Sequence, residues 1–203
     1  MSAFQGNNSS FILSEMKNKN KQKKAENQPQ SPQKIIVAKG RSLALLKCMV
    51  NQNWTISKMA NVLVIRQHAS GKVTVGVYLV DLMCLGVKDT FFIFNEEPGQ
   101  VEDEFESQNI VFKEIAYPLA HNIIFAGHDF AAEFDINPHP QFNITKYLLE
   151  EDDDNVPLIE ISVGNEEGKP QIIAEHAVQY ADALSKLKKH AGEGNYNYIV
   201  MEE

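Results

Sequence analysis

The sequence predicts an α+β fold, with a mostly antiparallel sheet of about five or six strands packed against two main helices. Two hairpin patterns and two amphipathic helix patterns follow one another without the regular strand-helix-strand alternation of a parallel sheet. At 203 residues, 43% of them hydrophobic, the chain can enclose one core of ordinary size. We therefore expect a single α+β domain over residues 35–203.

The first 34 residues differ in composition from the rest. The stretch SEMKNKNKQKKAENQPQSPQK has almost no apolar side chains, so it cannot bury enough surface to offset the entropy of ordering. Residues 1–34 carry six lysines against Glu15 and Glu26, a net charge of +4. Because the whole chain has a net charge of −8, residues 35–203 carry a net charge of about −12. We expect a disordered basic tail over residues 1–34, with a solubilising role. The alternative is an electrostatic arm whose lysines bind nucleic acid weakly or bind an acidic partner.

The best-defined strands flank the connection HASG at residues 68–71. VLVIRQ precedes it and KVTVGVYLV follows it, as expected for a β-hairpin. The two-residue period of a strand divides the second run into two faces, Val73, Val75, Val77 and Leu79 on one and Lys72, Thr74, Gly76 and Tyr78 on the other. The earlier block LALLKCMV, residues 43–50, is too short for periodicity to decide between a helix and a buried strand.

Two helices are predicted in the second half of the chain. The first spans Pro118–Phe134, where apolar side chains recur at intervals of four and three: Leu119, Ile123, Ala126, Phe130 and Phe134. A short helical piece around ITKYLLEED follows it. The second helix spans about Glu175–His190, with its core side formed by Ala177, Val178, Ala181, Leu184 and Leu187. Glycines end this helix, and YNYIVM follows as a last strand.

A second hairpin is predicted between these helices. LIEISVG and KPQIIA flank the turn sequence NEEG. In the first arm Ile159, Ile161 and Val163 alternate with Glu160 and Ser162, which predicts a strand with one face in water.

Four polar residues interrupt the apolar run YLVDLMCLGVKDTFF, residues 78–92: Asp81, Cys84, Lys88 and Asp89. If the strand continued through Leu85, Asp81 and Cys84 would face opposite sides of the sheet, and only a bulge or a strand end near Gly86 would bring them together. In the architectural interpretation, Asp81 accepts hydrogen bonds from the following turn or pairs with Lys88 or Arg66, and Cys84 packs inertly. In the catalytic interpretation, Asp81 is a general base or metal ligand, and Cys84 is a thiolate beside Lys88.

Histidine and acidic patterns predict no metal site and no cofactor. His121 and His128 are seven residues apart, roughly 10 Å along a helix, which is too far for one ion. The run EEDDDN at residues 150–155 lacks the spacing and central Gly of a calcium loop, so we expect a solvated loop. His139, within the PHP turn, is expected to be a surface group.

The remaining bulk properties narrow the cellular setting. Two cysteines without an apolar signal segment predict reduced thiols in the cytoplasm. No run reaches the roughly 18 apolar residues of a membrane-spanning helix, so no membrane partner is expected. The acidic charge of residues 35–203 argues against broad nucleic-acid binding by the folded part.

Three segments carry a resemblance to a known family. NVLVIRQHASGKVTVGVYLVDLMCLGVKDTFF, AHNIIFAGHDFAAEFDINPHPQF and YLLEEDDDNVPLIEISVG resemble an uncharacterised family of bacterial hypothetical proteins, with the hallmarks YLVDxxCLGVKD, HNxxxAG and PHxxF. The resemblance covers roughly residues 45–175 and implies no established activity. It places Asp81, Cys84, Lys88 and Asp89, together with His121 and Asn122, at the motif positions of the family.

Two functions from different classes follow. The first is a binding or regulatory module that recognises a protein or a small ligand through an acidic surface, since no residue set has the spacing of a known catalytic site. The alternative is a hydrolase-like enzyme with Asp81, Cys84, Lys88, His121 and Asn122 around one cleft, His121 serving as the base. The alternative requires that the CLGVKD turn meets the start of the helix at Pro118.

Overall fold

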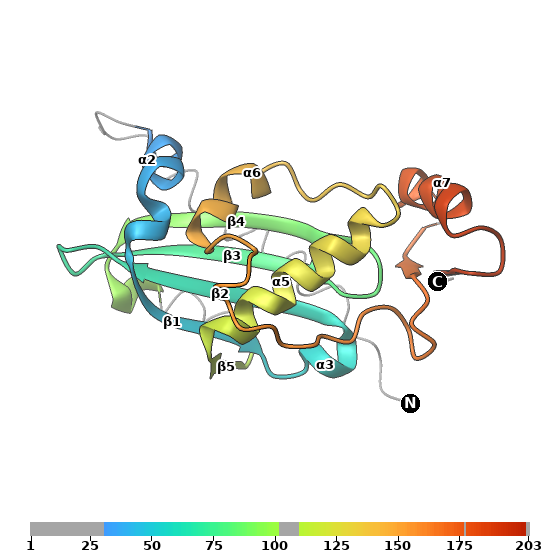
Figure 1. Ribbon diagram of the computed structural model, residues 1–203, viewed down its shortest axis with the longest axis horizontal. Helices are drawn as coiled ribbons and strands as arrows, with labels where there is room; N and C mark the ends of the chain where they lie inside the picture. Colours follow the sequence, from blue (N-terminus) through green and yellow to red (C-terminus); the bar gives the residue numbers. More distant parts are fainter. Residues whose placement is uncertain (1–30, 102–109, 177, 202–203) are drawn as a thin grey trace.

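The computed structural model describes residues 31–101, 110–176 and 178–201, and these form an α+β fold (Figure 1). Its centre is a five-stranded antiparallel sheet in the order β4-β3-β2-β1-β5. The strands are β1 Ala44–Asn51, β2 Met59–Gln67, β3 Val73–Asp81, β4 Gly86–Glu96 and β5 Phe112–Ile115. A separate two-stranded parallel sheet joins β6 Gln171–Ala174 to β7 Asn197–Val200. The expected fold class is therefore confirmed.

The helices are short apart from one. They are α2 Pro32–Lys39, α3 Trp54–Ser57, α5 Tyr117–Ala132, α6 Phe142–Thr145 and α7 Ala181–His190, with 3-10 turns η1 Gly40–Ser42 and η2 Lys146–Leu148. Among these described helices none is both long and apolar enough to cross a membrane. Helix α2 begins at Pro32, so residues 32–34, assigned to the tail from the sequence, are helical, whereas residues 1–30 of that tail lie outside the described ranges.

The first hairpin is confirmed. Strands β2 and β3 pair in one unbroken register from Gln67 and Val73 at the turn to Met59 and Asp81 at the far end. The block at residues 43–50, which periodicity left open, is strand β1, and it pairs with β2 through a register shift between Leu45 and Lys47. The sheet has a buried core on each side, so its central strands are apolar on both faces.

The two faces of the sheet have different neighbours. We call the side of the sheet that packs against α5 the near face. On this side, Ile123 and Ile124 of α5 pack with strand residues that include Val62, Val64, Tyr78 and Val80. Figure 1 shows α2, α5 and α6 on this same side of the sheet. We call the opposite side the far face, defined by Leu63, Ile65, Val73, Val75, Val77, Leu79, Phe91 and Ile93.

Helix α5 was predicted correctly in extent, but its sheet-facing side is shifted. Leu119 and Ala126, predicted on the core side, are only half-buried, whereas Ala120 and Gly127 are buried. A Cβ added at Gly127 would collide with Cγ1 of Val80 in β3. The glycine thus lets the helix backbone approach the sheet closely, and periodicity does not reveal this because Gly has no apolar side chain.

The predicted second hairpin is wrong beyond its turn. The turn itself forms, with Gly168 N donating to Asn165 O at 2.9 Å. Residues 158–163 then run without strand pairing, and Gly164 N donates to Leu82 O instead. The other arm contributes β6, which pairs in parallel with β7. The alternation of the first arm still holds, because Ile161 and Val163 pack against the near-face core while Ser162 is exposed.

The second predicted helix is shorter than expected. Helix α7 begins at Ala181 rather than Glu175, and Val178 is 80% exposed rather than on a core side. Ala177 lies outside the described residues. Ala183 and Leu187 anchor α7 against Ile172 of β6 and Leu85, so this helix packs on the end of the β3–β4 hairpin rather than over the central sheet. The expected last strand is present as β7.

Candidate functional site

Asp81 ends strand β3 and holds the turn that follows. Its Oδ1 accepts hydrogen bonds from the backbone N–H of Met83 at 2.8 Å and of Cys84 at 3.1 Å. Gly86 then starts β4 with φ of +63°, a left-handed conformation that favours glycine. Burial raises the pKa of Asp81, while the Lys88 charge and the turn N–H groups oppose that rise. This arrangement is the hydrogen-bonded turn of the architectural interpretation.

Cys84 lies in an apolar enclosure. Its exposed fraction is 0%, and its neighbours include Ala131, Ile136, Ile172 and Leu187. Burial raises the pKa of the Cys84 thiol to about 12, and the Asp81 charge adds to the rise. At neutral pH the side chain is a protonated thiol, which is a poor nucleophile.

Lys88 and Asp89 interact with other parts of the chain. The Nζ of Lys88 lies over the ring of Tyr180, 5.3 Å from its centre. Asp89 Oδ1 accepts from the N–H of Thr90 and lies 3.6 Å from Nε2 of His139. His139 is therefore more than the surface group expected from the sequence, since it ties the PHP turn to β4, and its own N–H donates to Val87 O.

His121 and Asn122 lie at a different place, beneath the acidic run. The His121 side chain is 2% exposed, with Nε2 3.4 Å from Glu150 O and Nδ1 4.0 Å from Asp152 Oδ1. Burial lowers the pKa of His121, so the ring is neutral at neutral pH, although Glu150 and Asp152 partly oppose this shift. The Asn122 amide donates to Pro157 O and its Oδ1 accepts from Ile159 N.

The predicted site residues thus fall into two groups. The turn after Asp81 meets α5 in its second half, because a Cβ on Gly86 would lie 2.7 Å from Cβ of Ala131 and 2.9 Å from Gly127 O. Gly127 is six residues after His121, or roughly 9 Å along the helix axis. The turn does not meet the start of α5, so the geometry does not assemble the cleft that the hydrolase-like alternative requires.

The acidic loop, residues 150–155, is held by partners that sequence reasoning missed. Arg66 of β2 is 3% exposed; its Nε donates to Leu148 O at 2.7 Å and its Nη2 pairs with Glu150 at 2.7 Å. Arg41 donates to Leu149 O at 2.7 Å and pairs with Glu151 at 2.6 Å. The loop is solvated as expected, with the Glu151 side chain 71% exposed, but the sequence did not reveal that its first two carboxylates pair with arginines. The sequence feature that indicates this anchoring is Arg66, a charged residue inside the apolar run VLVIRQ. From the sequence, Arg66 is considered only as a partner of Asp81.

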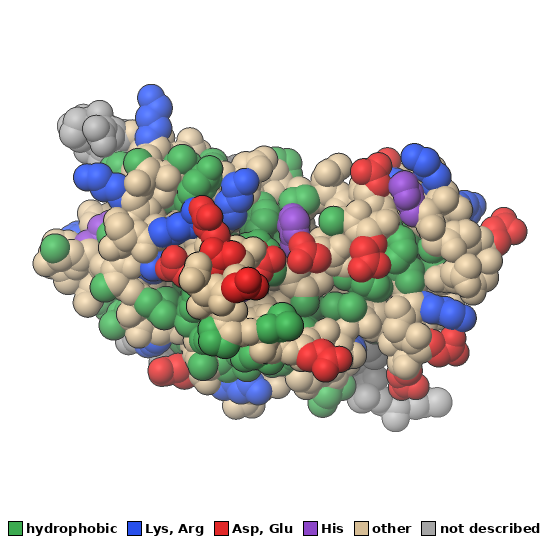
Figure 2. Space-filling view, viewed as in Figure 1, with side chains coloured by type: hydrophobic (Ala, Val, Ile, Leu, Met, Phe, Trp, Pro, Cys, Tyr) green, Lys and Arg blue, Asp and Glu red, His purple; other side chains and the backbone are tan. Residues whose placement is uncertain are grey.

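The middle of the acidic loop is open to water. Asp152, Asp153 and Asp154 are exposed, and the Asp152 side chain is about half accessible. Asp153 interacts locally, accepting from the N–H and side-chain amide of Asn155. Figure 2 shows acidic side chains gathered near the middle of the face that carries α5.

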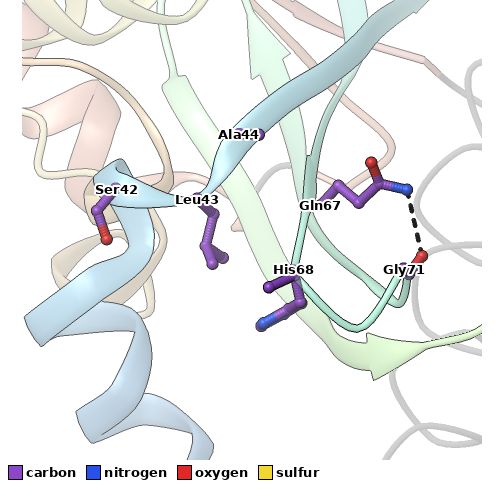
Figure 3. A pocket seen from close by; sticks show the side chains of 7 residues that line it. Ser42, Leu43, Ala44, Gln67, His68 and Gly71 are labelled. Carbon is purple, nitrogen blue, oxygen red and sulfur yellow. Dashed lines mark hydrogen bonds between the residues drawn. The ribbon is translucent and has the colours of Figure 1, made fainter.

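A hollow of about 550 Å³ lies between the start of β1 and the β2–β3 turn, at the end of the sheet opposite the Asp81 turn (Figure 3). Its polar side chains already have partners. Gln67 donates to Gly71 O at 3.3 Å, Ser42 donates to Lys39 O, and His68 Nε2 lies 2.7 Å from Thr74 Oγ1. With these groups engaged, the hollow offers little specific recognition to a small ligand.

In the part of the chain that the structure describes, no three His, Cys, Asp or Glu side chains lie close enough together to hold a metal ion. Comparison with protein-family models, with curated proteins and with solved structures finds no match for this chain.

Proposed function

We propose that the protein is a binding module whose acidic loop recognises a basic segment of a partner protein. One observation carries this proposal: both ends of the loop are fixed by buried polar groups, while the carboxylates of Asp152, Asp153 and Asp154 stand in water between them. A loop built in this way presents its charges at defined positions. Its partner does not have to supply the entropy of ordering the loop.

The anchoring of the loop accounts for much of the polar chemistry in this region. Before the loop, Arg66 donates to Leu148 O and pairs with Glu150. Arg41 donates to Leu149 O and pairs with Glu151. The Tyr117 hydroxyl accepts a hydrogen bond from the N–H of Glu150 at 2.6 Å. On the trailing side, Asn122 holds Pro157 and Ile159. A buried Arg that satisfies several carbonyl groups and one carboxylate fixes geometry rather than adding much stability.

The charge of the exposed carboxylates indicates the chemistry of the partner. Neighbouring like charges on a loop repel one another, and His121 beneath them is neutral at neutral pH. Lysine or arginine side chains of a partner would relieve this repulsion. Each exposed pair contributes roughly 0.5 kcal/mol, so we expect modest affinity with strong dependence on salt.

Binding of a short fluorescein-labelled lysine- and arginine-rich peptide, followed by fluorescence anisotropy, tests the proposal. The variant D152N/D153N/D154N is expected to weaken binding by about tenfold at ~50 mM salt, because three exposed pairs at roughly 0.5 kcal/mol each are lost. Raising the salt to ~200 mM is expected to remove most of the difference between variant and unmodified protein.

The matched control is E166Q/E167Q/E193Q, which removes the same formal charge at exposed positions outside the loop. It is expected to bind the peptide as the unmodified protein does. Equal weakening in the two variants would contradict the proposal, because it would show that the peptide responds to total charge rather than to the acidic loop.

A further inference from the structure

His121 lies enclosed beneath the acidic loop. Its side chain is 2% exposed, and its ring centre lies 4.5 Å from that of Phe125 and 5.8 Å from that of Tyr117. Both aromatic residues belong to α5, as does His121, so one helix fixes the orientation of the imidazole. Both ring nitrogens then have loop atoms as neighbours, with Nε2 3.4 Å from Glu150 O and Nδ1 4.0 Å from Asp152 Oδ1.

The carbonyl neighbour of the ring assigns the hydrogen of the neutral imidazole. A carbonyl oxygen can only accept a hydrogen bond, so Nε2 donates to Glu150 O. Nδ1 then carries a lone pair on the side of the Asp152 carboxylate, and neither atom has a hydrogen to donate. A second proton on the ring converts this mismatch into a charge-assisted hydrogen bond, once Asp152 moves roughly 1 Å closer. The exposed loop carries Asp152, so this small movement is available.

The other ionisable groups around His121 have partners of their own. They come from α5, from β2 and from the chain next to the loop: Tyr117, His128, Arg66, Arg41, Glu150 and Glu151. The two arginines pair with the first two carboxylates of the loop, and Asp152 is the next carboxylate along the chain. Burial lowers the pKa of His121, whereas Glu150 and Asp152 oppose this shift, so the ring takes up its second proton below pH 6.5.

We propose that His121 is a proton switch that regulates the acidic loop, an inference that rests on the proposed function. As the pH falls, the ring takes up a proton from water and its Nδ1–H binds the Asp152 carboxylate. One of the three exposed aspartates is then engaged from beneath, so the loop binds a basic partner more weakly. By linkage, a bound basic partner disfavours protonation of His121 to the same degree.

Anisotropy of the labelled lysine- and arginine-rich peptide at about pH 7.5 and about pH 5.5 tests the switch, because the peptide side chains do not titrate in this range. At ~50 mM salt the unmodified protein is expected to bind about two- to threefold more weakly at the lower pH, since one of three exposed pairs is lost. H121Q keeps a side-chain N–H for Glu150 O but takes up no proton. It is expected to lose most of this change in affinity.

The matched control is H190Q, which removes an exposed histidine outside the loop and is expected to keep the full pH dependence. A pH dependence in H121Q equal to that of the unmodified protein would overturn the switch and leave the proposed function standing. Equal binding by D152N/D153N/D154N and the unmodified protein at about pH 7.5 would instead refute the proposed function, and the switch with it.

An NMR titration of the unmodified protein tests the switch without any substitution. The His121 ring is expected to titrate at lower pH when the peptide saturates the loop, while the His190 ring titrates as before. The amide resonance of Asp152 is expected to shift with the same midpoint as the His121 ring. Titration of His121 that is unchanged by bound peptide would overturn the proposal.

Discussion

The near and far faces of the central sheet use equally apolar strands for different purposes. The near face combines its apolar core with polar anchors: Arg66 reaches the acidic loop, and Tyr78 donates its hydroxyl hydrogen to Thr145 O at 2.8 Å. The far face is formed by aliphatic and phenylalanine side chains. Alternation along one strand therefore separates a face that positions a loop from a face that only needs cover.

This difference indicates where function can be placed on the molecule. Polar groups buried on the near face have partners contributed by distant segments, such as Glu150, 84 residues after Arg66. Such long-range contacts fix the acidic loop on the rigid sheet. The far face contributes to stability through the burial of its apolar side chains.

The largest effect is expected from Arg66→Ala on the near face. The change removes the donors to Leu148 O and Leu43 O and leaves Glu150 without its arginine, at a cost of about 3 kcal/mol in the free energy of unfolding. Arg41→Ala, at a more exposed pair, is expected to cost less than ~1 kcal/mol. Denaturant unfolding measures both. Equal costs would show that burial of Arg66 is not what anchors the loop.

The next effect compares the two faces directly. Val75 on the far face and Val64 on the near face are both 0% exposed. If both faces are covered in solution, Val75→Ala and Val64→Ala should each lower the free energy of unfolding by about 2 kcal/mol, for the lost methyl groups and the cavity left behind. A cost for Val75→Ala well below that for Val64→Ala would indicate a far face that is open to water.

A comparable effect separates the architectural and catalytic interpretations of Asp81. Asp81→Ala leaves the N–H groups of Met83 and Cys84 without their acceptor and should cost about 1–3 kcal/mol. Asp81→Asn keeps an acceptor oxygen and removes a carboxyl group whose pKa is raised by burial. The free energy of unfolding of this variant at pH 7 should therefore be unchanged or increased. Because that pKa is raised in the fold, unmodified protein should gain stability relative to Asp81→Asn as the pH falls. Equal destabilisation by both variants would contradict the turn assignment.

The smallest effect concerns His121 under the acidic loop. Its folded pKa lies below the unfolded value of 6.5, so its contribution to stability is present above pH 6.5 and is lost as the pH falls through the folded pKa. His121→Phe cannot take up a proton, so its unfolding free energy should vary less between about pH 7 and pH 5, by under ~1 kcal/mol. Chemical denaturation across this range measures the slope. A slope equal to that of the unmodified protein would remove His121 as its source.

Local patterns predicted the elements whose partners are close in the sequence. The β2–β3 hairpin follows from strand alternation on both sides of HASG, and helix α5 follows from its apolar spacing. The second hairpin failed because alternation reports which side chains face a core and not what pairs with the backbone. Residues 158–163 alternate correctly, but their neighbours are Asn122, Lys58 and the turn at Leu82.

The candidate site divides in the same way. Asp81 as the holder of its own turn follows from local sequence, since its partners are two and three residues away. The anchoring of the acidic loop does not, because Arg41 and Arg66 approach it from positions 84 to 110 residues earlier in the chain. A charged residue within an apolar strand signals that a buried partner exists, but the sequence pattern does not identify that partner.

The most direct test of the contrast between the faces is hydrogen exchange across the whole chain, with and without a saturating lysine- and arginine-rich peptide. The account predicts that the peptide slows exchange at residues 150–156 and leaves the far-face strands β3 and β4 unchanged. Slower exchange confined to the far-face strands, or no change at residues 150–156, would contradict it.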